Sequence, residues 1–112
     1  MKIRKGTVKD IPKLIKLYSG VKEIMDSPND KKDSSYFKAF LKKGRIILVA
    51  EIDKEIAGAL NAEIDDAGYV FLNNIVTNRK FRGKGIGTKL MFELEKITKK
   101  NIPVKWNSNP MH

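Results

Sequence analysis

The chain has 112 residues, a length that fits one hydrophobic core, so we expect residues 1–112 to form a single domain. It has no cysteine and one histidine, His112, which excludes disulfides, thiolate catalysis, Cys-based or His-rich metal sites and a triad built on an internal histidine. With 41% hydrophobic and 32% charged residues and no apolar run near the roughly 20 residues of a membrane span, the sequence predicts a globular cytoplasmic protein without a membrane partner or a bound metal.

The net charge of +10 is unevenly distributed along the chain. Residues 1–50 carry a net +8 and residues 79–105 a net +7, whereas residues 51–78 carry −5. A basic balance indicates a polyanionic partner, although a lysine-rich surface that only maintains solubility explains it equally well. The acidic middle zone is not expected of a uniform nucleic-acid binder. It fits a protein that holds a polyphosphate with one segment and a cationic substrate with the next.

The N-terminal residues predict a strand followed by a helix. Residues 1–5 alternate as a short strand does, and residues 7–10 (Thr-Val-Lys-Asp) resemble a capping box with aspartate in place of glutamate. Apolar residues then recur at steps of three and four, which predicts a helix that runs to about Met25. They are Ile11, Leu14, Ile15, Leu17, Tyr18, Val21, Ile24 and Met25.

Residues 26–35 consist of helix breakers and charges and are predicted to form a loop. Such a loop either borders a binding site or is only a solvated connection, and the sequence leaves both interpretations open. Aromatic and apolar residues between Tyr36 and Leu41 then indicate a second short helix, which Gly44 ends.

From Arg45 the hydrophobic pattern changes from helix to strand. Residues 46–50, 55–64 and 69–77 read as three strands joined by short turns, which predicts an antiparallel meander. A helix over residues 85–100 and a last strand over residues 102–106 follow. The predicted fold is therefore α/β (α+β): a mixed, mainly antiparallel sheet, flanked by helices, in the order β-α-α-β-β-β-α-β.

The most informative segment is Arg-Gly-Lys-Gly-Ile-Gly-Thr, residues 82–88, which lies between a predicted strand and a predicted amphipathic helix. The unpaired amides and the positive dipole end of such a helix form an anion site, and glycines allow these amides to approach a ligand closely. The spacing G-x-G-x-G is neither the dinucleotide fingerprint nor a P-loop. The motif gains weight because it follows an antiparallel meander.

These residues resemble the GNAT superfamily of acetyl-CoA-dependent N-acetyltransferases, whose phosphate loop R/Q-x-x-G-x-G/A is matched by Arg82, Gly85 and Gly87. Residues 75–87 also resemble the family's strand-to-helix signature, and the element order from Met1 to Trp106 fits. The resemblance implies transfer of an acetyl group from acetyl-CoA to an amine by direct attack. No covalent enzyme intermediate is then needed, which suits a chain without cysteine.

The resemblance further implies which residues bind acetyl-CoA. Loop amides would hold the pyrophosphate, and backbone groups of Ile75 and Thr77 would hold the pantetheine arm, which runs alongside the strand. An amide near Ile75 or Val76 would polarise the thioester carbonyl, while these two side chains pack in the core. The expected cofactor-binding set is Ile75, Val76, Thr77, Arg82, Gly83, Lys84, Gly85, Ile86, Gly87, Thr88 and Asn109.

The chain departs from the family at the position of the general base. Many members carry a carboxylate nine residues before the loop arginine, where this chain has Asn73. An amide does not accept a proton at neutral pH, so the base is missing, replaced by water, or supplied from elsewhere. Glu63 on the preceding strand is the candidate, with an ordinary surface carboxylate as the alternative interpretation. Asn73 would instead orient substrate or water, or satisfy backbone groups at a bulge.

A second departure concerns the C-terminus. The family continues with a helix whose tyrosine protonates the departing thiolate, and then with two strands, so we expect a fold cut in that helix's first turn, at Asn109. Tyr18, Tyr36 and Tyr69 precede the loop and do not occupy the motif position. An open sheet edge near residues 102–106 would follow, and we expect it to pair in a homodimer.

Two other functions remain open from the sequence. One is a non-catalytic module that binds CoA or acetyl-CoA, because base and acid are both absent from their usual positions. The other, ranked last, is nucleic-acid binding by residues 79–105, with Phe81 and Trp106 as stacking candidates.

Overall fold

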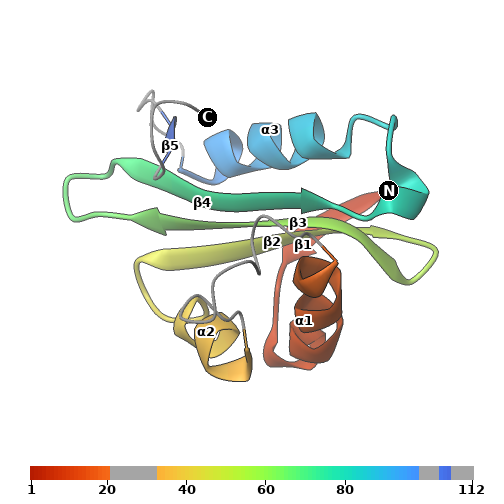
Figure 1. Ribbon diagram of the computed structural model, residues 1–112. Helices are drawn as coiled ribbons and strands as arrows, with labels where there is room; N and C mark the ends of the chain where they lie inside the picture. Colours follow the sequence, from red (N-terminus) through yellow and green to blue (C-terminus); the bar gives the residue numbers. More distant parts are fainter. Residues whose placement is uncertain (21–32, 99–103, 107–112) are drawn as a thin grey trace.

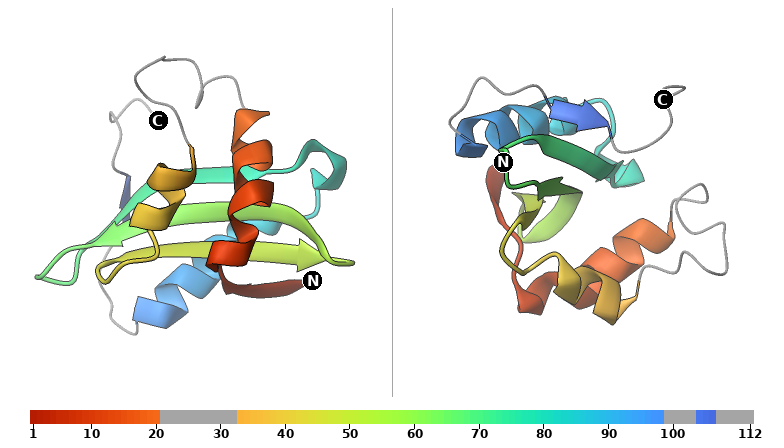
Figure 2. Two further views of the ribbon diagram at one scale, coloured as in Figure 1. Left: turned by 90° about the horizontal axis from the view of Figure 1, so that it is seen from below. Right: turned by 90° about the vertical axis from the view of Figure 1, so that its left-hand side faces the viewer.

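The computed structural model describes residues 1–20, 33–98 and 104–106, and within them an α+β fold (Figure 1). Its elements are β1 (Lys2–Lys5), the 3₁₀ turn η1 (Val8–Asp10), α1 (Ile11–Ser19), α2 (Ser34–Ala39), β2 (Arg45–Ile52), β3 (Glu55–Ile64), β4 (Val70–Thr77), the 3₁₀ turn η3 (Arg79–Phe81), α3 (Ile86–Thr98) and β5 (Val104–Trp106). The described strands form one sheet in the order β1-β2-β3-β4-β5, and the expected meander β2-β3-β4 is antiparallel. Helix α3 covers one face of the sheet, and α1 and α2 cover the other (Figure 2).

Two predicted boundaries differ from the structure, and parts of three predicted elements lie outside the described residues. Helix α1 ends at Ser19 with Gly20 as its C-cap, because glycine is a poor helix former, and the predicted continuation over residues 21–25 lies outside the described residues. The predicted loop ends before Ser34, because Asp33 caps α2 by accepting a hydrogen bond from the Tyr36 amide at 3.1 Å. The rest of that loop, residues 26–32, and the start of the last predicted strand, residues 102–103, also lie outside the described residues.

The start of α1 is fixed to the sheet by a charged cluster. Arg4 on β1 donates to both carboxylate oxygens of Asp10, at 2.8 and 2.9 Å, and to Glu51 on β2 at 2.9 Å. The expected capping box between Thr7 and Asp10 is present, with the Thr7 amide donating to Asp10 at 2.8 Å. The Arg4 guanidinium beside Asp10 is the main reason why the pKa of this carboxyl falls to about 2.

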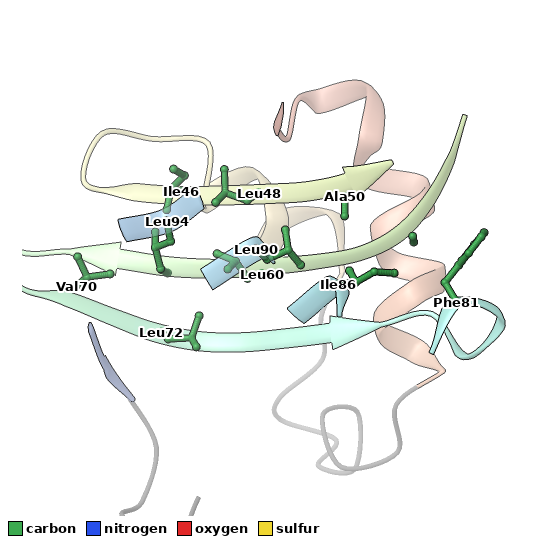
Figure 3. Close-up of a cluster of buried hydrophobic side chains, with 12 residues drawn as sticks. Ile46, Leu48, Ala50, Leu60, Val70, Leu72, Phe81, Ile86, Leu90 and Leu94 are labelled. Carbon is green, nitrogen blue, oxygen red and sulfur yellow. The ribbon is translucent and has the colours of Figure 1, made fainter. Parts of the chain in front are cut away.

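Two apolar clusters hold the helices on the sheet. On one face, Leu90 and Leu94 of α3 are fully buried against β2, β3 and β4, in a cluster here called the α3-side cluster (Figure 3). On the other face, Leu14 of α1 and Phe37 of α2 are fully buried. Gly58 on β3 brings the first turn of α3 close to the sheet, since a Cβ atom there would lie 2.7 Å from Ile86 Cγ2. This close approach fixes the position of the loop that precedes α3.

Strand β4 pairs with β3 along its length but with β5 only at its start, and this leaves an open edge. Its register against β3 shifts between Asn61 and Ala62, which leaves Asn73 as the extra residue of a β-bulge. On its other side, β4 pairs in parallel with β5 over residues 70–72. Beyond that point, residues 73–77 have no strand partner on this side within the described parts of the chain. The homodimer expected through the outer edge of β5 remains a prediction.

Candidate functional site

The segment between β4 and α3 is a tight reversal built from local interactions. Asn78 Oδ1 accepts a hydrogen bond from the Lys80 amide at 3.0 Å and starts η3. Phe81 anchors the segment in the α3-side cluster and is only 7% exposed, so it is not available as a nucleic-acid stacking platform, which corrects that expectation. Gly83 and Gly85 then adopt left-handed backbone angles, with φ of 83° and 71°, and α3 begins at Ile86.

The N-terminus of α3 presents free backbone donors. The first helical hydrogen bond runs from the Lys89 amide to the Gly85 carbonyl, at 3.1 Å. The amides before Lys89 have no helical acceptor, and they lie at the positive end of the helix dipole. Open space adjoins Gly85, because a Cβ atom placed there would meet nothing within 4 Å. The arrangement can bind a phosphate group through backbone amides.

A cavity of about 540 Å³, here called the loop cavity, lies in front of these amides. Its lining is Ile75, Val76, Thr77, Phe81, Arg82, Gly83, Gly85, Ile86, Gly87 and Thr88. Nine of the eleven residues expected to bind the cofactor are therefore brought together around one space. Lys84 does not line this cavity, and Asn109 lies outside the described residues. Phe81, which was not expected in this role, contributes to the wall.

The open edge of β4 leads into the loop cavity. Ile75 packs its half-buried side chain on the α3-side cluster, and Val76 is buried in the cluster under α1 and α2. Both side chains thus lie in the core as expected, and both residues also line the loop cavity together with Thr77. A sheet edge with unpaired backbone groups can accept an extended ligand as an added strand.

Asn73 lies in the bulge at the far end of this edge. Its Oδ1 atom is buried and accepts no hydrogen bond from the described residues. A buried oxygen without a donor is unfavourable by about 1–3 kcal/mol, so this position favours a ligand or water that brings a donor. The structure places Asn73 at a bulge, while its side chain's expected roles, to orient substrate or water or to satisfy backbone groups there, stay predictions.

Three of the six carboxylates in the acidic zone, residues 51–78, form ion pairs outside the loop cavity. Glu63 pairs with Arg45 across the β2–β3 ladder, with Nε and Oε1 3.3 Å apart. Glu51 pairs with Arg4 and Glu55 with Lys80. These pairs give no support to Glu63 as a general base or to a cation site in this zone. The described residues also contain no group of three or more acidic, histidine or cysteine side chains suited to a metal.

A buried polar network beside the bulge was not identified from the sequence. Asn61 on β3 is fully buried and accepts the Tyr18 hydroxyl at 2.7 Å, while its amide donates to the Tyr36 hydroxyl at 2.8 Å. Asn74, next to the bulge, also donates to Tyr36 at 3.2 Å. Burial raises the pKa of Tyr18 well above its usual value, so its hydroxyl stays protonated and donates. The available signal was a single asparagine within the apolar run of residues 56–62.

Three of the solved structures that share this fold are acetyltransferases by name. The chain superposes on the PaiA N-acetyltransferase of Thermoplasma acidophilum, solved in complex with coenzyme A, with a TM-score of 0.75 and 21% identity over 88% of this chain and 71% of that one. An aminoglycoside acetyltransferase from an uncultured soil metagenomic sample, solved with sisomicin, superposes with a TM-score of 0.72. The identity is 19% over 98% of this chain and 78% of that one. The ribosomal-protein-alanine N-acetyltransferase of Brucella melitensis superposes with a TM-score of 0.74. The identity is 17% over 98% of this chain and 82% of that one.

The family of the chain follows from its sequence. No match was found among the curated proteins. No helix in the described parts of the chain is long and apolar enough to cross a membrane. The sequence profile of the Acetyltransferase (GNAT) family matches residues 11–107, which is most of the chain. The chain therefore belongs to the GNAT family of acetyltransferases.

Proposed function

We propose that this protein transfers an acetyl group from acetyl-CoA to an amine. The observation that carries the proposal is the open edge of β4, which runs from the bulge at Asn73 into the loop cavity. An extended thioester with a diphosphate at one end matches this combination of a free strand edge and an amide-lined anion site.

The chain's own groups account for donor binding. Amides of the first turn of α3, from Gly85 to Thr88, would hold the diphosphate, and the exposed guanidinium of Arg82 would add a positive charge beside it. Backbone groups of Ile75 and Thr77 would bind the pantetheine amides along the edge. The complex of the Thermoplasma relative with coenzyme A supports this ligand at family level.

The chemistry requires positioning more than proton transfer by the protein. The nitrogen of the neutral amine attacks the thioester carbonyl carbon, the carbon–sulfur bond breaks and the thiolate leaves. The extra proton on the attacking nitrogen passes to water, which leaves the neutral amide. A backbone amide near Ile75 or Val76 stabilises the negative charge that develops on the carbonyl oxygen. Asn73, at the bulge, would help to orient the incoming amine.

Calorimetry with acetyl-CoA, followed by thiol release over a panel of amines, tests the proposal. We expect saturable binding well below about 1 mM and thiol release that depends on the amine. Binding without release over the whole panel would favour the non-catalytic module. An absence of binding at that concentration would contradict both.

Substitution of Asn73 tests the missing base. Asn73→Glu restores a carboxylate at the family's base position, and we expect faster thiol release near neutral pH with unchanged acetyl-CoA affinity. Asn73→Gln is the matched control, because it has the same length without the charge. Equal rates in the two variants would show that proton removal does not limit the reaction.

A further inference from the structure

A second cavity, here called the basic cavity, lies beside the loop cavity and shares Thr77 and Arg82 with it. Its volume is about 410 Å³, and it lies between α1, the β2–β3 turn, the start of β3, the end of β4 and the segment that follows β4. Its lining is Lys13, Lys16, Leu17, Gly20, Lys54, Glu55, Ile56, Thr77, Asn78, Arg79 and Arg82. Five of these side chains are cationic and one is anionic.

The charges of the basic cavity are not balanced within the described structure. The carboxylate of Glu55 is bound by Lys80, which lies outside the lining, at 2.8 Å. None of the five lining cations forms an ion pair with another described residue, whereas Arg4 and Arg45 both do. Cations gathered without counter-charges repel one another, and an anionic ligand removes that repulsion.

Lys54 reaches the basic cavity from a turn that does not suit it. The β2–β3 hairpin turns at Asp53 and Lys54, whose φ angles are 50° and 67°. Glycine is preferred at the second position of such a turn, because other residues pay in steric strain for a left-handed conformation. A lysine at this position breaks a local rule, and such breaks concentrate at functional sites.

The remaining walls indicate the kind of anion. Arg79 and Arg82 offer guanidinium groups, whose planar arrangement of donors matches phosphate, and the apolar side chains of Leu17 and Ile56 offer contact to a ligand body. The volume lies in the range of small-molecule sites. We propose that the basic cavity binds a phosphomonoester carried on a small, partly apolar organic body.

Two sources share this chemistry. Thr77 and Arg82 line both cavities, so an occupant of the basic cavity lies next to a donor in the loop cavity. The phosphomonoester belongs either to the 3′-phosphoadenosine end of CoA itself or to a separate phosphorylated molecule. The first source rests on the proposed function, whereas the second does not.

Phenyl phosphate is the probe, titrated by calorimetry and by NMR of methyl and backbone amide groups. We expect saturable binding with shifts of the Leu17 and Ile56 methyl signals. Lys54→Gly removes a charge and suits the turn, so it is expected to raise the melting temperature while weakening binding by about tenfold. The control Lys42→Gly removes an exposed lysine that lines neither cavity, and its binding is expected to match the wild type.

Three results would overturn the proposal. These are equal losses in Lys54→Gly and Lys42→Gly, shifts confined to the amides of residues 85–88, or no saturation by roughly 10 mM probe. Lys16→Gln, on a different wall, provides an independent repeat and is expected to weaken binding without moving the melting temperature.

CoA and dephospho-CoA distinguish the sources. If the basic cavity holds the 3′-phosphate of CoA, then CoA displaces phenyl phosphate and dephospho-CoA does not. Lys54→Gly then lowers the affinity for CoA but not the affinity for dephospho-CoA. If the ligand is a separate molecule, phenyl phosphate binds equally well in the presence of either compound. Failure of the proposed function is recognised independently, because thiol release from acetyl-CoA, or CoA binding altogether, would then be absent while phenyl phosphate still binds.

Discussion

The loop cavity and the basic cavity adjoin each other, yet they are built for anions in different ways. The loop cavity relies on backbone amides at the start of α3, and Arg82 is the one cationic side chain among its described lining residues. The basic cavity gathers five cationic side chains from α1, the β2–β3 turn and the segment that follows β4. Binding at the first depends on backbone conformation, and binding at the second depends on charge. The two cavities should therefore respond to different perturbations.

The largest expected effect comes from changing backbone conformation at Gly85. Gly85→Val places a branched side chain at φ 71° and extends it into the open space in front of the amides. We expect CoA affinity to fall about 100-fold, close to 3 kcal/mol, while phenyl phosphate binding in the basic cavity changes little.

Gly44→Val is the matched control for Gly85→Val. Gly44 has a comparable φ of 85° but lies before β2 and lines neither cavity. Both variants should lose stability by similar amounts in thermal melts, and CoA affinity should fall in Gly85→Val alone. Equal affinity losses would mean that general strain, and not approach to the phosphates, controls binding.

The two cavities also differ in how far they could be predicted from the sequence. The loop is contiguous, and its glycines, helix start and preceding strand are all local signals, so its cavity could be anticipated nearly residue by residue. The basic cavity joins Lys16, Lys54 and Arg79, which belong to three separate segments. The network around Asn61 likewise depends on Tyr18 and Tyr36 from two helices. Periodicity does not specify which helix meets which strand, so these arrangements required the fold.

The next largest effect concerns acid, because Asp10 anchors the helix that forms one wall of the basic cavity. Its pKa lies at about 2 in the folded protein, below the ordinary 3.8, so the carboxylate stabilises the fold above about pH 4. As pH falls from 4 toward 2 this contribution is lost, and it amounts to about 2 kcal/mol. Helix α3 has no such anchor in the described residues.

Hydrogen exchange and acid unfolding measure this contribution. Between pH 4 and 2, amides of α1 should lose protection before those of α3, and the free energy of unfolding should fall. Asp10→Asn should be less stable near neutral pH and should show a smaller change over the same interval. Parallel acid curves for the variant and the wild type would contradict the role of Asp10.

A smaller effect is expected from the polar network that holds α1 and α2 on β3. Tyr18→Phe removes the donor to Asn61 Oδ1 at a fully buried position, while the bond from Asn61 to Tyr36 remains. We expect the free energy of unfolding to fall by about 1.5 kcal/mol. Phenyl phosphate affinity should weaken more than CoA affinity, because residues of α1 line the basic cavity but not the loop cavity. Urea unfolding and titrations of the same variant provide both values.

The smallest effect, and the most direct test of the contrast between conformation and charge, is salt. Raising NaCl from about 50 to 200 mM shortens the screening length and weakens side-chain attraction at exposed sites. The ratio of phenyl phosphate affinities between the wild type and Lys54→Gly should therefore shrink, by about two- to threefold, or less than 1 kcal/mol. The ratio of CoA affinities between the wild type and Gly85→Val should stay constant, because that substitution removes no charge. If both ratios shrank equally, side-chain charge would govern both cavities, and the amides of α3 would not be the main phosphate ligands.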